Sequence, residues 1–286
     1  MLYQLYIGEH IMKRFDFHVH FNSDDPQAVA ELAELCRANN TILAFSGGFN
    51  YGECYYPPTE TVLAAAKKYP DVFVPFASFR LWDTVNADDV YRYAEMGCRG
   101  LKCIYPYYAY DHDIYMPVYE AAAKCGLPIL FHTGNIRPNA DDIIYRRPML
   151  KNMHPINLDR IARSFPDLKI VMAHLGTRIY QDEAAQYIKM HANLYADLGG
   201  CGQWKRMQPE TLNNLLLPET MLIDPSFANY RKLVLGSDAY VTYPWIVTEA
   251  QKYYLALLDR IGVPQEIIDD IMGGTVAKWL GVNLED

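Results

Sequence analysis

The sequence lacks paired cysteines, an excess of positive charge and a long hydrophobic run. Its six cysteines form no CxxC pair, and 26 Lys and Arg stand against 34 Asp and Glu, a formal net charge of −8. The longest stretch free of these charged residues covers only residues 38–52, whereas a membrane helix needs ~20 apolar residues. These absences argue against a zinc–thiolate site, a nucleic-acid partner and a membrane span. Because the start also lacks a signal-peptide pattern, we expect a cytoplasmic protein.

What the sequence does contain is a regular alternation of short apolar runs with helical patterns. Hydrophobic residues make up 51% and charged residues 21%, which are globular proportions. The runs are continuously apolar, as in a buried parallel sheet, and the segments between them, such as 26–40 and 156–165, follow a helical period. We therefore expect an α/β fold, a (β/α)8 TIM barrel formed by a single domain over residues 1–286, with a doubly wound open sheet as the alternative. The eight runs occupy residues 15–20, 41–47, 72–79, 100–105, 128–134, 169–176, 193–199 and 233–240.

Residues 1–11 are not needed by this pattern. Only Lys13 and Arg14 separate Met12 from the first run, so the segment before Met12 has two interpretations. It is either a non-native extension of the reading frame or an N-terminal strand or lid on the barrel. N-terminal mass spectrometry of the protein from its native source separates the two.

Histidines and one aspartate stand where the apolar runs end. His18 and His20 close the first run, His132 the fifth, His174 the sixth and Asp238 the eighth. Two residues apart on a strand, His18 and His20 point to the same side, and we expect Asp16 to point with them. In a barrel all these strand ends meet at one rim, and polar side chains there are costly unless they are paired or bind a ligand. The pattern predicts a shared metal site.

The same segments resemble the amidohydrolase superfamily, and more narrowly its amidohydrolase-2 branch of decarboxylase-like and lactonase-like enzymes. The resemblance covers about residues 13–281 and is carried by DFHVH at 16–20, GLPILFHTG at 126–134, FPDLKIVMAHLG at 165–176, NLYADLG at 193–199, LGSD at 235–238 and IMGGTVAKWLG at 271–281. Members of the family usually have Asn at the position of Thr275, and they often have Pro soon after the aspartate that corresponds to Asp238. Because this chain lacks that Pro, we expect the rim after its last strand to differ from the rim of the family.

The resemblance implies roles for these residues. His18, His20, His132 and Asp238 would hold one divalent ion, Zn(II) in preference to Mn(II), Fe(II) or Co(II). Asp238 would be the general base, and His174 would hydrogen-bond the attacking water or the developing oxyanion.

Lys102, at the end of the fourth run, has two interpretations. We favour one metal ion, with Lys102 binding a substrate anion or orienting the site. In binuclear relatives such as dihydroorotase-like enzymes, a lysine on this strand is carboxylated and bridges two metals, which leaves a second ion open.

The substrate is indicated by arginines and tyrosines that follow the runs. A guanidinium can fork a carboxylate, and phenols provide flat walls with a polar tip, so we expect a small carboxylic acid, aromatic or unsaturated. The residues expected to contact it are Lys102, Arg80, Arg137, Arg178, Tyr105 and Tyr240.

Three functions remain open at this point. The first is hydrolysis of a lactone, ester or amide by a metal-activated water, and the second is metal-dependent, non-oxidative decarboxylation of an unsaturated or aromatic acid. The third is a binding protein that kept the barrel, which a missing metal ligand would indicate, and none is missing. A homodimer is compatible with such a barrel, although no patch for it can be identified.

Overall fold

Eight parallel strands form a ring in the computed structural model of the protein. The structure describes residues 13–51, 54–136, 149–200, 205–217 and 227–284, so the predicted extension at 1–11 and Arg137 lie outside the described residues. The sheet has the order β10-β1-β2-β5-β6-β7-β8-β9. Its strands are β1 (Arg14–His20), β2 (Thr41–Ser46), β5 (Phe73–Arg80), β6 (Gly100–Ile104), β7 (Ile129–Phe131), β8 (Ile170–Met172), β9 (Leu194–Ala196) and β10 (Ala239–Tyr240).

The eighth predicted run closes the ring, although only its last two residues form a regular strand. On one side, Leu233 pairs in parallel with Ala196 of β9, and Val234 N donates to Ala196 O. On the other side, Phe17 N of β1 donates to Leu235 O, and Val19 and His20 pair with β10. The expected TIM-barrel fold is confirmed, because every predicted run contributes to one parallel ring.

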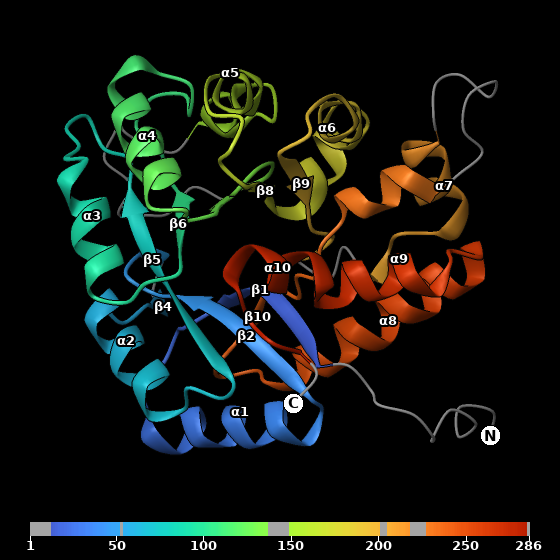
Figure 1. The fold of residues 1–286 in the computed structure, drawn as a ribbon, viewed down its shortest axis with the longest axis horizontal. Helices are drawn as coiled ribbons and strands as arrows, with labels where there is room; N and C mark the ends of the chain where they lie inside the picture. Colours follow the sequence, from blue (N-terminus) through green and yellow to red (C-terminus); the bar gives the residue numbers. More distant parts are fainter. Residues whose placement is uncertain (1–12, 52–53, 137–148, 201–204, 218–226, 285–286) are drawn as a thin grey trace.

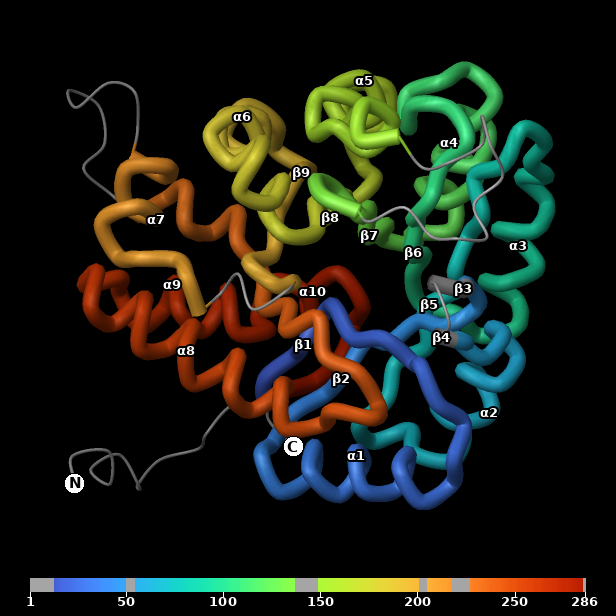
Figure 2. The backbone as a smooth tube through the Cα atoms, turned by 180° about the vertical axis from the view of Figure 1, so that it is seen from behind, coloured from blue at the N-terminus to red at the C-terminus, as the bar shows by residue number. Residues whose placement is uncertain are grey.

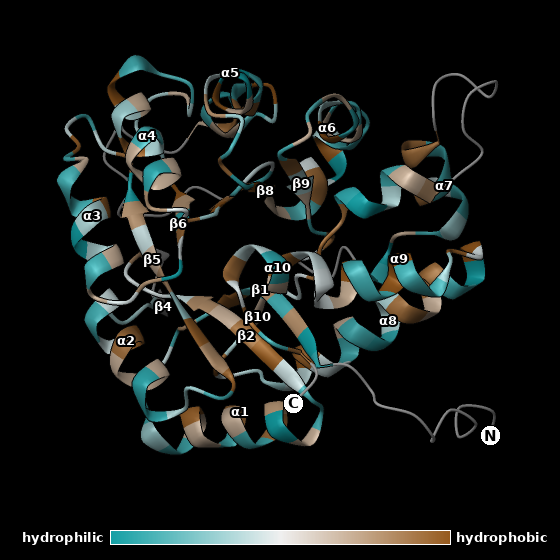
Figure 3. Cartoon of the chain, viewed as in Figure 1, coloured by the Kyte–Doolittle hydropathy of each residue, from teal (hydrophilic) through white to brown (hydrophobic). Residues whose placement is uncertain are grey.

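Helices surround the ring, as Figures 1 and 2 show from opposite sides. The first begins where its sequence predicts, because the Asp25 carboxylate accepts hydrogen bonds from Gln27 N and Ala28 N and Pro26 occupies the first turn. In Figure 3 β2 is largely brown, whereas α1 alternates between brown and teal, as expected for a helix with one buried face. The helices are α1 (Pro26–Ala38), α2 (Thr59–Lys68), α3 (Asp88–Glu95), α4 (Met116–Lys124), α5 (Asn157–Ser164), α6 (Thr177–Met190), α7 (Pro209–Leu216), α8 (Trp245–Ile261), α9 (Gln265–Asp269) and α10 (Thr275–Leu280).

A two-stranded hairpin, β3 (Asn50–Tyr51) with β4 (Cys54–Tyr55), follows β2 and was not expected from the sequence. No helix within the described ranges is both long and apolar enough to cross a bilayer.

A β-bulge in β1 decides which residues face the barrel interior. Asp16 pairs with Leu43 and Val19 with Phe45, so β1 has one more residue than β2 over this interval. Phe17 packs on Phe76 inside the ring (centroids 5.0 Å apart).

The extra residue lets His18 face the interior as well, directly after Phe17 along the chain. The expectation that Asp16 points with His18 and His20 was therefore wrong. Asp16 shares the face of Leu43, which packs in the outer layer under α1, and its carboxylate accepts hydrogen bonds from the backbone N–H groups of His18 and Ser237.

Candidate metal centre

The bulge turns His18 into the centre of a buried polar network. His18 Nδ1 donates to Asp197 Oδ2 (2.9 Å), which leaves Nε2 as an acceptor. That Nε2 lies 2.8 Å from Lys102 Nζ and 3.2 Å from Asp238 Oδ1. His20 Nε2 donates to the same Asp238 oxygen at 2.8 Å. Residues from β1, β6 and the ends of β9 and the eighth run thus meet at one point of the rim.

The last strand end holds Asp238 in a strained conformation. Asp238 has φ +58°, a backbone region that costs a non-glycine residue ~1–3 kcal/mol, and its N–H donates to His18 O. His174 and the following Leu175 also have positive φ, +67° and +43°. The surrounding packing holds these strained residues in place, and their clustering at strand ends is typical of a functional site.

His132 and His174 extend the network across the barrel mouth. His132 Nε2 lies 3.2 Å from Asn135 O, so this nitrogen donates, and Nδ1 accepts from His174 Nε2 at 3.2 Å. One ligand atom each of His18, His174 and Asp238 lie within 4.8 Å of one another. The structure therefore brings all five predicted side chains into one cluster, with His174 rather than His20 or His132 in the tightest group.

Asp197 belongs to the site, although no role was predicted for it from the sequence. It is fully buried at the end of β9, and besides His18 it accepts hydrogen bonds from the N–H groups of His174 (2.8 Å) and Gly199 (2.9 Å). One carboxylate therefore positions both the first histidine of the cluster and the backbone that carries His174. The sequence contains a signal for this role, because Asp197 is a polar residue near the end of an apolar run, as His132, His174 and Asp238 are.

The electrostatics favour neutral imidazoles beside an ionised carboxylate. Burial lowers the pKa of His18 and His132 well below the ordinary value, and lowers the pKa of His174 to about 4. Burial would raise the pKa of Asp238, but the proximity of His18 and the hydrogen bond from His20 outweigh it and hold that pKa well below its usual range. Unprotonated imidazole nitrogens and a carboxylate are the ligands that a divalent transition-metal ion requires.

Two further observations bear on a bound ion. His20 Nδ1 is buried and, among the residues that the structure describes, has no hydrogen-bond partner. Lys102 is fully buried, and burial lowers the pKa of its ammonium to about 8, which leaves it mostly charged at neutral pH. The donor set fits a divalent ion, although a charged Lys102 competes with it for His18 Nε2.

An aromatic wall borders the cluster on the side of His20. Tyr240 stacks on the His20 ring with centroids 5.3 Å apart, and Phe49 and Tyr56 approach it edge-on. Tyr105 packs against the same buried group. Of the residues expected to contact substrate, Tyr240 and Tyr105 thus lie at this wall, and Lys102 lies inside the cluster.

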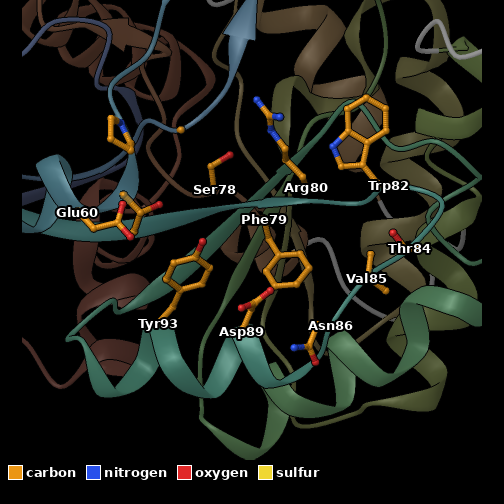
Figure 4. Close-up of a pocket in the computed structure, with 13 residues that line it drawn as sticks. Glu60, Ser78, Phe79, Arg80, Trp82, Thr84, Val85, Asn86, Asp89 and Tyr93 are labelled. Carbon is orange, nitrogen blue, oxygen red and sulfur yellow. The ribbon is translucent and has the colours of Figure 1, made fainter.

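Two of the arginines that were expected to contact substrate, Arg80 and Arg178, lie in different parts of the structure. Arg80, at the end of β5, lines a cavity of about 360 Å³ between β5, α2 and α3 (Figure 4). Arg178 is exposed in the first turn of α6.

Parts of the chain resemble curated dihydroorotases. A dihydroorotase from Pectobacterium carotovorum is 26% identical over 195 residues, which cover 60% of this chain and 50% of the relative; another from Azotobacter vinelandii is matched over 36% of its length. The chain thus spans half or less of the length of these curated relatives.

Solved structures resemble almost the whole chain. An uncharacterized TIM-barrel protein from Bordetella bronchiseptica matches with a TM-score of 0.66 at 16% identity, over 94% of this chain and 99% of that one. A probable 2-pyrone-4,6-dicarboxylic acid hydrolase from Acinetobacter baumannii (94% and 100% covered) and a 5-carboxyvanillate decarboxylase from Sphingomonas paucimobilis (95% and 100%) each match with a TM-score of 0.56 at 14% identity. The sequence pattern of the Amidohydrolase family matches residues 7–282, and the chain belongs to that family.

Proposed function

We propose that the protein is a metal-dependent hydrolase that cleaves a C–O or C–N bond of a small carboxylated compound, a lactone, ester or amide. The observation that carries this proposal is the cluster itself, in which four imidazoles and one carboxylate meet at the mouth of a barrel. Ligand atoms of His18, His174 and Asp238 lie within 4.8 Å of one another, and hydrogen bonds join His20 and His132 to this group. The dihydroorotases and the probable dicarboxylic acid hydrolase named above support hydrolysis. A small carboxylic acid as substrate, a homodimer and a cytoplasmic location remain predictions.

The ligands that we propose for the ion are His18, His20, His132 and Asp238, with Zn(II) as the ion. His132 Nδ1 would bind the ion in place of the hydrogen bond that it now accepts from His174 Nε2, which would free the N–H of His174 for the substrate. A divalent ion held by these residues would lower the pKa of a bound water molecule toward neutrality. Asp238, ionised and held by His20, accepts the proton of the attacking water and passes it to the leaving group. His174 donates a hydrogen bond to the oxygen on which negative charge develops.

Lys102 contributes the positive charge of the site. Its ammonium lies 2.8 Å from His18 Nε2 and is fully buried, and the carboxylates of Asp238 and Asp197 favour its charged form against the cost of burial. We propose that a substrate anion takes this ammonium as its partner. Arg178 and the aromatic wall of Tyr240 and Tyr105 would contact the remainder of the substrate.

The second candidate is non-oxidative decarboxylation of an unsaturated or aromatic acid. The buried Lys102 favours it, because an ammonium beside the cluster would hold the carboxylate that leaves as CO2. The decarboxylase among the similar structures supports the same direction. Here Asp238, which is ionised in the free site, would first accept a proton from a water molecule or a substrate hydroxyl and then deliver it to the carbon that CO2 leaves.

Metal content and product analysis test these proposals together. The metal per chain is measured by elemental mass spectrometry in wild type, Lys102→Ala and the control Lys124→Ala, whose lysine is exposed and paired with Glu120. One equivalent in all three supports a single ion, two equivalents that fall only in Lys102→Ala support a carboxylated-lysine pair, and no metal after supplementation overturns the mechanism.

Turnover separates the two reactions. Lactones, esters and cyclic amides are assayed for acid release, and unsaturated and phenolic acids for CO2. We expect Asp238→Asn to keep the fold and lose turnover, because an amide cannot accept the proton. Full activity of this variant would remove Asp238 from the mechanism.

A further inference from the structure

The cavity at the end of β5 contains a buried hydroxyl without a hydrogen-bond partner among the described residues. Ser78 is 7% exposed, and its Oγ has no hydrogen-bond partner within the described part of the chain. A buried hydroxyl without a partner costs free energy, so its position calls for a ligand. Ser78 lines the cavity of about 360 Å³ at the end of β5.

A cation lies two residues farther along the same strand. Figure 4 shows the side chains of Ser78 and Arg80 on one side of β5 and that of Phe79 on the other. Arg80 is exposed toward the rim, and no ion pair holds its guanidinium among the residues that the structure describes. A guanidinium presents paired N–H donors that match the two oxygens of a carboxylate.

The start of α2 forms a third side of the cavity. This ten-residue helix has Pro58 at its N-cap and no side-chain hydrogen bond to its first turn, so the first-turn N–H groups lack a side-chain acceptor. Pro58 and Thr59 both line the cavity.

Gly48 leaves the space in front of the helix open. A Cβ at Gly48 would lie 3.2 Å from Ser78 Cβ and 3.6 Å from Thr59 Oγ1. A side chain at this position would therefore crowd the gap between the hydroxyl of Ser78 and the start of α2.

We propose that Ser78, Arg80 and the first turn of α2 bind a carboxylate of the substrate that does not take part in the bond change. Ser78 pairs in register with Lys102 across β5 and β6, and neighbouring strands lie ~4.8 Å apart. The carboxylate subsite and the metal centre therefore open at the same mouth of the barrel. This inference rests on the proposed function for its choice of substrate, and it adds that the substrate carries a second polar end.

The acidic residues of the cavity favour a carboxylate over a phosphate. Asp89 lines the cavity from α3 but is held by Arg92 at 2.9 Å, and Figure 4 shows it on the side of β5 opposite Arg80. Glu60, in the first turn of α2, is exposed. Glu60 is therefore the acidic residue close to the proposed subsite, and it would repel a dianionic phosphate more than a carboxylate.

Binding of a planar diacid tests the subsite without turnover. Isophthalate is titrated by calorimetry into wild type, Arg80→Met, Arg80→Lys, Ser78→Ala and the control Arg163→Gln, each as purified and after chelation. Arg163 is exposed on α5 and paired with Asp159, so its replacement removes the same charge elsewhere. We expect Arg80→Met to weaken binding ~10-fold or more and Ser78→Ala by a smaller factor, with Arg80→Lys between wild type and Arg80→Met. Chelation should leave these ratios unchanged, because the subsite consists of protein groups.

Three outcomes would overturn the subsite. They are wild-type affinity in both Arg80→Met and Ser78→Ala, an equal loss in Arg163→Gln, or binding that disappears on chelation while Arg80→Met has no effect. Absence of any wild-type binding at millimolar isophthalate would also overturn it. Because binding is read directly, a protein that binds through Arg80 but turns over no lactone, ester, amide or acid would overturn the proposed function and leave the subsite intact.

Discussion

Replacing Asp197 with asparagine should weaken metal binding while the barrel stays folded. The asparagine oxygen can still accept the hydrogen bonds from the N–H groups of His174 and Gly199, which now reach Asp197 Oδ1. The other carboxylate oxygen, which receives His18 Nδ1, becomes an NH2 group that can only donate. His18 must then carry its proton on Nε2, the nitrogen that faces Lys102 and Asp238.

The behaviour of other metal sites indicates the size of the effect. Loss of a partner behind a metal-binding histidine typically costs 10–100-fold in metal affinity, ~1.4–2.7 kcal/mol. The loss of one hydrogen bond to a charged group should reduce the free energy of unfolding by ~1.5–3 kcal/mol, which a barrel of this size tolerates. Competition with a chromogenic chelator measures the affinity for Zn(II), and urea unfolding measures the stability.

A matched control is Asp113→Asn, whose carboxylate is exposed and paired with Arg160. Gly236→Ala tests the same point sterically, because its Cβ would approach Asp197 Cβ to 2.7 Å and force that side chain to move. Unchanged metal affinity in Asp197→Asn and in Gly236→Ala, with both variants folded, would refute the argument that Asp197 fixes the proton position of His18.

Three other outcomes follow from burial. His18→Ala should lower the bound metal per chain below that of wild type, whereas the exposed His112→Ala should not; equal metal content would mean that β1 does not anchor the ion. Phe76→Ala should cost ~3–5 kcal/mol in urea unfolding, since Phe76 is 1% exposed inside the ring, while Tyr55→Ala, 60% exposed, should change little. Burial raises the pKa of Cys98 to about 12, so a thiol reagent at pH 8 should modify it, as followed by peptide mapping, only after unfolding; rapid labelling of the folded protein would contradict its burial.

The barrel and its rim could be predicted from the sequence because both depend on local patterns. A continuously apolar run indicates a buried parallel strand, and a polar residue at its end indicates the rim of the barrel. Neither prediction depends on the rest of the chain. His132 and His174 were located in this way and meet at 3.2 Å. Asp197 has the same signal, but carboxylates are common at strand ends, and its role depends on His18, 179 residues away.

The details that depend on register could not be predicted. The bulge in β1 adds one residue without glycine or proline to mark it, so the alternation of side chains placed Asp16 on the wrong face. The positive φ of Asp238 and His174 likewise leaves no trace in the residue types, because surrounding hydrogen bonds impose it. The absence of a hydrogen-bond partner for the Ser78 hydroxyl, among the described residues, is evident only when the positions of β5, α2 and Gly48 are known.

In the bulge of β1, one peptide bond links Phe17, which packs inside the barrel, to His18, which belongs to the metal centre. Phe17 rests on Phe76 and on Trp279 of the C-terminal helix α10, whose ring centroid is 6.1 Å away, and His18 follows immediately. A change at Trp279 that lets Phe17 settle by even a fraction of an ångström would move His18 relative to Asp197 and Asp238. The packing of Phe17 against Phe76 and Trp279 thus influences the geometry of the metal centre. A stabilising substitution in this part of the core is expected to change the metal affinity before it changes other properties.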